Sequence, residues 1–518
     1  MEQYKNKKSF LFNEQKNERE KVLKNIYNLN KILHKKNIDE QLRGQFIGTT
    51  LLYIRDVQKH LSISVITDDT KIQLITYWNN FSSEQIRSDI EKTLVSLLNG
   101  SDNRDLKVKL LVRNVLDNNN VKSLTSIDWI DILNEIVENI YTYIDTDQFG
   151  GQDVLSLFFD AFNKYTRRLD KNQVFTPAHI ANFMCRVAGV DKTKIVFDGT
   201  CGSGSLLIQA MFMEMVDCNQ QEVTEIEKNV MCHQVVTNHI YGVELEDGAF
   251  GLSTTNMLIH GNVHSNIKNI NFFNSEEIIR QIDPDIILMN PPYNAKPITI
   301  PIKYKISWKS DTKVDPTKGM VFLKYLSDVI KKMNVERIIE SKPAKEVKVA
   351  ILLPVATAIG TSKYISNIKK ELLKDNTLDA VFTLPDEIFY PGASVSACCM
   401  MFTLGRPHVM SDGEVPKTFF GYYKEDGHKK KKNLGRIEQF DKDNNSIWKQ
   451  IEDEWLDLYR NKIVKDGMSA MQTVTGDDEW LCEAYMKTDY SKLSEADFQQ
   501  TLNDYLAYLI KEGKIYES

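Results

Sequence analysis

The stretch Asp285-Ile-Ile-Leu-Met-Asn-Pro-Pro-Tyr293 joins a short apolar run to a stiff, proline-rich end. Residues 286–289 have the length and character of a strand that is buried on both faces, as in a parallel sheet. The two prolines cannot donate to a β-ladder, and Pro291 favours an extended backbone at Asn290. The stretch therefore predicts a rigid loop at the carboxyl end of a buried strand, where open α/β sheets bind their ligands.

The four residues of this loop suit chemistry on a planar, conjugated amine such as the N6 amine of adenine. The lone pair of such an amine is delocalised, and two acceptors on its two hydrogens would localise it for attack. The side-chain oxygen of Asn290 and the carbonyl of Pro291 can be these acceptors, while Pro291 and Pro292 hold them in place without reorganisation cost. Tyr293 would stack on the base, a contact worth about 1–3 kcal/mol in nucleic-acid sites. The alternative is a plain loop with a core tyrosine.

The middle of the chain, residues 166–405, alternates between β-rich runs and helical patterns. This alternation predicts a doubly wound α/β sheet. The expected strands lie at residues 194–197, 240–243, 286–289, 349–353, 380–384 and 396–404.

The two flanks of this region look helical. Residues 1–165 carry apolar residues at helical spacing, which predicts an amphipathic helical domain; the two clearest stripes are Val22, Ile26, Leu29 and Leu33, and Trp129, Leu133, Ile136 and Ile140. Residues 406–518 look loop-rich and then helical, and the last helix begins at a capping box, Ser494 to Asp497. We expect this third part to dock a partner.

A glycine-rich turn, Asp198-Gly-Thr-Cys-Gly-Ser-Gly204, follows the first expected strand and precedes a helix that begins at Ser205. It lacks the Gly-Lys-[Ser/Thr] ending of a phosphate loop, and Leu207 replaces the third glycine of the dinucleotide fingerprint. The turn suits S-adenosylmethionine, which has no phosphates. Asp198 can bind the ammonium group of that cofactor, and Glu244, at the end of the next strand, can accept both ribose hydroxyls.

A Thr176-Pro177 step lies just upstream and starts another helix. The amino terminus of that helix and the hydroxyl of Thr176 could face the carboxylate of the cofactor. Such a step is also a commonplace helix start.

The length, composition and charge of the chain limit the classes of protein to which it can belong. A chain of 518 residues is expected to form two or three domains, and no apolar run reaches membrane-spanning length. Seven cysteines without a CxxC pair predict reduced thiols in a cytoplasmic protein, and nine scattered histidines without a metal-like cluster predict no metal. The net charge of −6 means that any basic DNA-binding surface must be local or supplied by a partner. The lysines at 429–432 could contact phosphate, although such runs are more often solvated.

The order of these motifs resembles the γ-ordered N6-adenine DNA methyltransferases. Within them the chain is most similar to the modification subunit of type I restriction–modification systems. The resemblance implies a Rossmann-like methyltransferase domain at residues 166–405, a cofactor site for S-adenosylmethionine and a base site for adenine extruded from double-stranded DNA. The implied cofactor residues, with Asp198 as above, are Gln173, Phe175, Thr176, Pro177, Gly202, Ser203, Gly204, Ser205 and Glu244. The implied base residues are Asn290, Pro291, Pro292 and Tyr293.

The sequence departs from the family pattern at two positions. Gly199 stands where the family usually has proline, which should loosen the turn without removing a contact. Asn274 stands where an aspartate commonly contacts the adenine of the cofactor, and an amide can substitute because it both donates and accepts.

The resemblance also implies a separate specificity subunit that binds two copies of this chain and chooses the DNA site. The sequence has no Walker A lysine loop and no nuclease-like carboxylate cluster, so restriction would belong to another polypeptide. Three alternatives stay open: a stand-alone DNA adenine methyltransferase, an enzyme acting on another planar amine (protein glutamine or RNA guanine), and a non-catalytic binding subunit.

Overall fold

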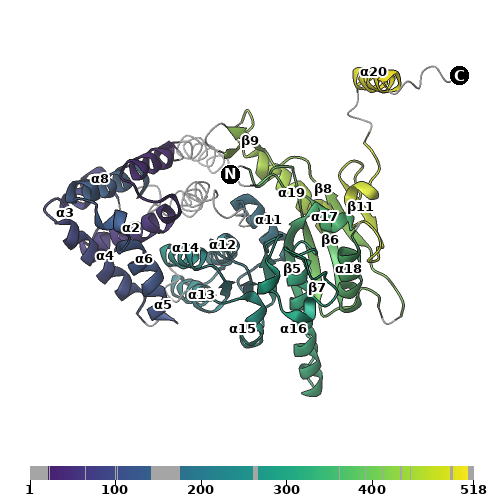
Figure 1. Cartoon of the computed structure of the whole chain (residues 1–518), viewed down its shortest axis with the longest axis horizontal. Helices are drawn as coiled ribbons and strands as arrows, with labels where there is room; N and C mark the ends of the chain where they lie inside the picture. Colours follow the sequence, from purple (N-terminus) through teal and green to yellow (C-terminus); the bar gives the residue numbers. More distant parts are fainter. Residues whose placement is uncertain are drawn as a thin grey trace.

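The computed structural model describes residues 21–141, 176–260 and 266–511, except residues 23, 65, 100, 102, 361, 391, 392, 411, 432–434, 444 and 490–493. A group of helices lies beside a large α/β body, and the last helix stands apart from both (Figure 1). Among the described helices, none has the length and apolar character needed to cross a membrane.

The amino-terminal region is helical, as the sequence predicts. Besides the helical residues 24–35, it contains α2 (Glu40–His60), α3 (Asp68–Tyr77), α4 (Ser83–Leu97), α5 (Arg104–Val108), η1 (Lys109–Arg113), α6 (Asn114–Leu116), α7 (Asn119–Lys122), α8 (Ser126–Ile136) and η2 (Val137–Tyr141). Both apolar stripes expected from the sequence are buried. The core of this region continues onto α14 (Asp247–Ile259) of the α/β body, where Arg55 Nη1 donates to the carbonyl of Ile259 at 2.6 Å.

A nine-stranded sheet forms the α/β body. In spatial order its strands are β11 (Ser469–Gln472), β8 (Thr418–Tyr422), β6 (Asn376–Thr383), β7 (Ala397–Leu404), β5 (Val347–Pro354), β4 (Ile286–Met289), β1 (Val196–Asp198), β2 (Ile240–Glu244) and β3 (Ile267–Asn269). The five strands from β5 to β3 are parallel, and β7 is antiparallel to both of its neighbours.

The strand order reverses between β1 and β4. From β1 the chain continues outward through β2 and β3, and it then returns to the other side of β1 as β4. Phe197 of β1 lies opposite both Tyr241 of β2 and Ile287 of β4, so the carboxyl ends of the three strands meet at one edge. Such a reversal is where open α/β sheets leave a crevice for ligands.

Helices cover both faces of the sheet, which confirms the doubly wound fold class. The core on one face is formed with α11 (Ala178–Ala188), α12 (Ser205–Asn219), α13 (Glu225–Asn238) and α19 (Ile447–Arg460). The core on the other face is formed with α15 (Glu276–Ile282), α16 (Met320–Ile339), α17 (Val355–Ile359) and α18 (Lys363–Asp375).

The sheet does not end at residue 405. Strands β8 and β11 come from the segment that the sequence suggests is loop-rich, and they extend the sheet beyond β6. The same segment forms a hairpin of β9 (His428–Lys431) and β10 (Gly435–Glu438), which carries three of the four lysines at 429–432. The ring of Trp455 in α19 stacks on Tyr423 with centroids 3.9 Å apart. This segment is therefore built into the body.

The last helix, α20 (Glu495–Lys511), has no buried residue. One half of the expected capping box forms, since the backbone N–H and the hydroxyl of Ser494 both donate to the Asp497 carboxylate, while the N–H of Asp497 donates to the carbonyl of Ser494. Its apolar stripe is exposed, with Phe498 at 54%, Leu502 at 50% and Tyr505 at 57%. The apolar stripe of α20 is of the kind that packs against another surface, but no part of the described chain covers it.

Candidate active site

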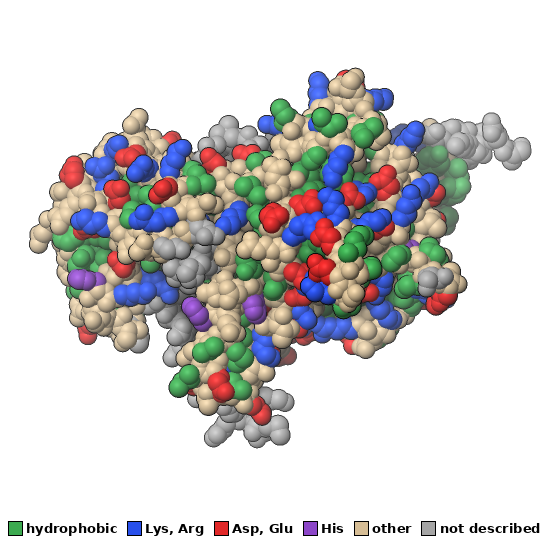
Figure 2. All heavy atoms as spheres, turned by 90° about the horizontal axis from the view of Figure 1, so that it is seen from below, with side chains coloured by type: hydrophobic (Ala, Val, Ile, Leu, Met, Phe, Trp, Pro, Cys, Tyr) green, Lys and Arg blue, Asp and Glu red, His purple; other side chains and the backbone are tan. Residues whose placement is uncertain are grey.

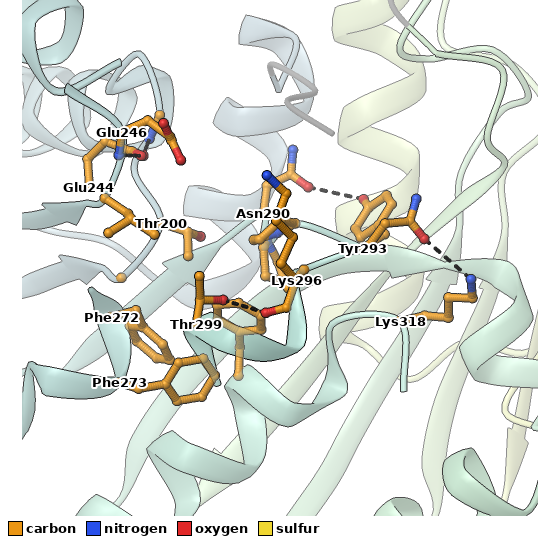
Figure 3. Close-up of a pocket in the computed structure, with 18 of the residues that line it drawn as sticks. Thr200, Glu244, Glu246, Phe272, Phe273, Asn290, Tyr293, Lys296, Thr299 and Lys318 are labelled. Atoms are coloured by element: carbon orange, nitrogen blue, oxygen red, sulfur yellow. Dashed lines mark hydrogen bonds between the residues drawn. The ribbon is translucent and has the colours of Figure 1, made fainter. Parts of the chain in front are cut away.

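A cavity of about 430 Å³ opens where the carboxyl ends of β1, β2 and β4 meet. Glu244 and Thr200 lie toward one end of it, and Asn290 and Tyr293 toward the other (Figure 3). Phe272 and Phe273 of η4 (Phe272–Asn274) form an apolar wall. Its volume is in the range of small-molecule sites.

The glycine-rich turn passes from β1 into α12 through two left-handed residues. Gly202 has φ 54°, and Gly204, the residue before α12, has φ 85°. This backbone region suits glycine. A close approach explains a further glycine in β2, because a Cβ at Gly242 would lie 2.7 Å from Leu207 Cδ1. The helix that follows the turn is thus packed directly onto the neighbouring strand.

Two buried carboxylates stand at the ends of β1 and β2. Glu244 accepts from the backbone N–H of Gly202 at 2.8 Å and of Glu246 at 2.9 Å. Asp198 accepts from the N–H of Thr200 at 2.9 Å. Burial raises the pKa of Glu244. Burial, helped by the nearby charge of Glu244, raises the pKa of Asp198 to about 8.

These groups favour a cationic, hydroxyl-bearing ligand. A cation beside Asp198 would offset the desolvation that makes its carboxylate unfavourable. The hydroxyl of Thr200 is buried and has no hydrogen-bond partner among the described residues, although Thr200 lines the cavity. An unmatched buried hydroxyl is costly unless a ligand pairs with it.

The side-chain amide of Asn290 is oriented by hydrogen bonds at both ends. Its Nδ2 donates to Thr176 Oγ1 at 3.0 Å, and its Oδ1 accepts from the hydroxyl of Tyr293 at 3.0 Å. Thr176 is 5% exposed and Tyr293 is 9% exposed, so both contacts are shielded from water. Burial also raises the pKa of Tyr293, which keeps its phenol protonated as a donor.

The structure brings together most, but not all, of the site residues expected from the sequence. Gly202, Glu244 and the four residues Asn290, Pro291, Pro292 and Tyr293 line the cavity. Asp198, Ser203, Gly204 and Ser205 form the turn beside it. Thr176 faces Asn290, whereas Pro177 ends the loop before α11. Gln173 and Phe175 lie outside the described residues.

Asn274 is exposed and is not among the residues that line the cavity; Asn271, three residues earlier, is. The side chain of Asn271 donates to the carbonyl of Thr299 at 2.7 Å. The two aromatic residues between them face the cavity and were missed by the sequence interpretation, which considered only the polar side chain after β3. The sequence signal for them is the Phe-Phe pair itself.

The structure explains why residue 199 is a glycine, which the sequence alone did not. A Cβ at this position would lie 2.2 Å from Cε2 and 2.3 Å from Cδ2 of the Phe272 ring. The ring therefore occupies the space that a proline or any other side chain would need. The absence of a side chain at position 199 is thus tied to the aromatic wall.

Three residues with metal-ligating side chains lie together elsewhere, although the sequence gives no metal-like spacing. They are His179, Asp426 and His428. Asp426 accepts from His179 Nε2 at 2.9 Å and from both terminal nitrogens of Arg436 at 2.5 and 2.6 Å. His179 also stacks on His428, with centroids 3.9 Å apart. Because a guanidinium already neutralises this carboxylate, the group joins the β9–β10 hairpin to α11 without requiring an ion.

The fold and the cavity define an open α/β protein with a cavity of small-molecule size at the carboxyl ends of its central strands. The model of the N-6 DNA Methylase family matches residues 151–506, and the chain belongs to this family. It is 27% identical over 376 residues to the type II restriction enzyme and methyltransferase RM.BcgI of Heyndrickxia coagulans, covering 70% of this chain and 51% of that protein.

It is also 24% identical over 277 residues to the type I restriction enzyme EcoEI methylase subunit of Escherichia coli, covering 52% of this chain and 51% of that protein. The chain thus spans about half the length of these curated relatives. A solved structure, the type I restriction–modification methyltransferase subunit of Streptococcus thermophilus, superposes with a TM-score of 0.54 at 15% identity. That match covers 90% of this chain and 100% of the other, and it shows a shared fold.

The contact between Gly199 and Phe272 predicts a coupled effect on stability. Gly199→Ala should lower the free energy of unfolding by about 1–3 kcal/mol, as overpacking does. In a Phe272→Leu background the same substitution should cost less, which a double-mutant cycle measured by urea unfolding would show. Gly248→Ala is the control, because nothing lies within 4 Å of its Cβ position. An equal cost in both backgrounds would rule out the clash.

Proposed function

We propose that this chain transfers a methyl group from S-adenosylmethionine to the N6 amine of adenine in DNA. The observation that carries the proposal is the oriented amide of Asn290, which shares one cavity with the strand-end carboxylate Glu244. Membership of the N-6 DNA Methylase family supports the same reaction. Enzymes that act on other planar amines share the Asn-Pro-Pro-Tyr loop, and the helical regions on both sides of the catalytic domain favour the DNA enzyme over them.

The end of the cavity near Glu244 fits the cofactor. The carboxylate of Glu244 can accept from ribose hydroxyls, and the unpaired hydroxyl of Thr200 can pair with a polar group there. Asp198 gains from a neighbouring ammonium, since burial disfavours its charged form. The aromatic wall of Phe272 and Phe273 suits a planar base. When bound, S-adenosylmethionine supplies an electrophilic methyl group.

The end near Asn290 fits the target amine. The oxygen of Asn290 and the carbonyl of Pro291 would each accept one hydrogen of the adenine amine and so localise its lone pair. In this structure the amide oxygen accepts from the hydroxyl of Tyr293, a bond that the target amine would share or replace. Stacking of Tyr293 on the base stays a proposal; in this structure Tyr293 lines the cavity and its hydroxyl donates to Asn290.

We further propose that the chain acts as the modification subunit of a type I system, in three parts at residues 1–165, 166–405 and 406–518. The third part contributes β8 and β11 to the sheet and ends in α20, whose exposed apolar stripe suits docking to a helical partner. That partner would be a separate specificity subunit shared by two copies of this chain, and a restriction subunit would be a further polypeptide. A stand-alone enzyme is the second candidate.

The direct test is methyl transfer to DNA from labelled S-adenosylmethionine. Wild-type chain should transfer slowly alone and site-specifically once the specificity subunit is added. Asn290→Ala should reduce the rate by about 100-fold or more, the usual cost of losing one preorganised polar group. Cofactor affinity, measured by calorimetry, should be unchanged. Asn290→Ala turnover within tenfold of wild type would remove the amide from the mechanism, and strong specific methylation by the chain alone would favour the stand-alone enzyme.

Because Asn290 donates to Thr176, the threonine can have one of two roles: it can orient the amide of Asn290, or it can contact the cofactor. If Thr176 orients the amide, Thr176→Val should lower kcat by about 5- to 30-fold, since an unmet buried hydrogen bond costs about 1–2 kcal/mol. Thr176→Ser should restore most of it. If Thr176 instead contacts the cofactor carboxylate, Thr176→Val should weaken cofactor binding and leave kcat near wild type. Calorimetry and single-turnover rates together distinguish the two outcomes.

The raised pKa of Asp198 predicts how cofactor affinity depends on pH. The pKa of Asp198 is about 8, so its carboxyl group is increasingly protonated as the pH falls below that value. An ammonium ligand binds the ionised carboxylate. Affinity should therefore rise nearly tenfold from pH 6 to pH 7, and it should fall again above about pH 8 as the α-amino group of the cofactor loses its proton. Asp198→Asn should bind more weakly at pH 7 and flatten the rise. A flat wild-type profile would place the ammonium elsewhere.

A further inference from the structure

The segment that follows the Asn-Pro-Pro-Tyr loop, residues 294–319, is unusually basic for this chain. It contains six lysines and two aspartates, hence a formal charge of +4, within a protein whose net charge is −6. One of the aspartates, Asp315, is buried and accepts from the N–H groups of Thr317 and Gly319. The charge that reaches the surface is therefore almost entirely positive.

The segment is anchored to the body along its inner side. Ile300 is 2% exposed, and the hydroxyl of Tyr304 donates to Asp328 of α16 at 2.9 Å. The N–H of Asp315 donates to the carbonyl of Ala295 at 2.9 Å, which ties the two ends together. Two short turns, η5 (Pro297–Thr299) and η6 (Ile302–Tyr304), lie between these anchors. The segment thus presents a defined outer side.

That outer side combines large aliphatic side chains with lysines. Ile298, Ile302 and Ile306 are 87%, 79% and 80% exposed. Lys303, Lys309 and Lys313 are exposed as well, and none of them has an acidic ion-pair partner among the described residues. Three isoleucines exposed to this extent within one short segment are unfavourable in water unless a partner covers them.

The surface adjoins the cavity. Lys296 and Lys318, at the two ends of the segment, both line it (Figure 3). Lys318 Nζ lies 3.4 Å from Asn294 Oδ1, next to Tyr293. Whatever covers the segment therefore lies at the entrance through which the substrate base must pass.

We propose that residues 294–319 bind the DNA duplex beside the extruded adenine. In this arrangement Lys309 and Lys313 contact phosphates, and Ile302 and Ile306 pack against the bases that lose their stacking neighbour. The inference rests on the proposed function, which requires a flipped base. Apolar side chains are used in this way by proteins that unstack DNA, and lysine–phosphate contacts supply the affinity.

Charge complementarity favours DNA over an acidic protein partner. On the face of the molecule in Figure 2, basic and acidic side chains are interspersed, as on an ordinary surface. The 294–319 segment differs, since its exposed lysines have only one exposed aspartate, Asp311, among them. A regular polyanion with planar apolar groups matches lysines and isoleucines together, and duplex DNA with an extruded base is such a partner.

The lysine contacts can be tested by the salt dependence of binding to a short labelled duplex with one unpaired adenine. Lys309→Ala/Lys313→Ala in the full chain should weaken binding about tenfold or more and lower the slope of log affinity against log salt by about 2, close to 0.9 per lost phosphate contact. The matched control is Lys363→Ala/Lys374→Ala, which removes two exposed lysines from α18. The control should change the slope much less.

The isoleucine contacts can be tested with 2-aminopurine in place of the target adenine, whose fluorescence rises on unstacking. Ile302→Ser/Ile306→Ser should reduce that rise at least threefold at saturating protein. Ile338→Ser/Ile339→Ser, at the exposed end of α16, should leave it near wild type. Circular dichroism and cofactor affinity would show that both variants are folded.

Equal effects of the segment and control variants would overturn the inference, and so would failure of the wild-type chain to bind the duplex at low salt. Equally tight, lysine-dependent binding of polyglutamate would assign the surface to an acidic protein instead. Calorimetry with S-adenosylmethionine tests the proposed function independently of DNA binding. Absence of cofactor binding would contradict the proposed function, whereas intact cofactor binding with unchanged DNA binding in the segment variants would contradict this inference alone.

Discussion

The hydrogen bond between Asn290 and Thr176 is the contact on which the arrangement of the site depends. It joins residues 114 positions apart, one at the end of a buried strand and the other just before α11. β4 supplies a rigid base for Asn290 because all four of its residues are buried between β1 and β5. α11 supplies the other side through His179 and Arg186, which bind Asp426 and Glu452. The amide is therefore fixed by the cores on both sides of it.

The central sheet and most of the cavity could be predicted from the sequence because their signals are local. A buried parallel strand such as 286–289 is a continuous apolar run, and Asp198, Glu244 and Asn290 directly follow or end such runs. The helical amino-terminal flank was equally clear, because the spacing of Val22, Ile26, Leu29 and Leu33 predicts a buried helix face from the local sequence alone. In these places local pattern and global fold agree.

The features that the sequence did not give depend on partners far along the chain. β8 and β11 are five and four residues long, and they become strands only because β6 offers a free edge. The role of Gly199 depends on Phe272, which lies 73 positions later and fills the space of its missing side chain. The hydrogen bond between Thr176 and Asn290 could not be foreseen from the sequence, and a role of Thr176 in cofactor binding stays a prediction. Asn274 follows the right strand and yet is exposed and not among the residues that line the cavity.

The strand order also determines when the site can be completed as the chain is synthesised. β7 lies between β5 and β6 but follows both in sequence, so the outer edge of β5 stays unpaired until residue 404 has emerged. The cavity is lined by Gly199 at one extreme and Val395 at the other. At roughly 5–20 residues per second, the ribosome needs on the order of 10–40 s between them. Between the completion of β5 at residue 354 and that of β7 at residue 404, the nascent chain exposes a hydrophobic strand edge, which is a template for wrong pairing.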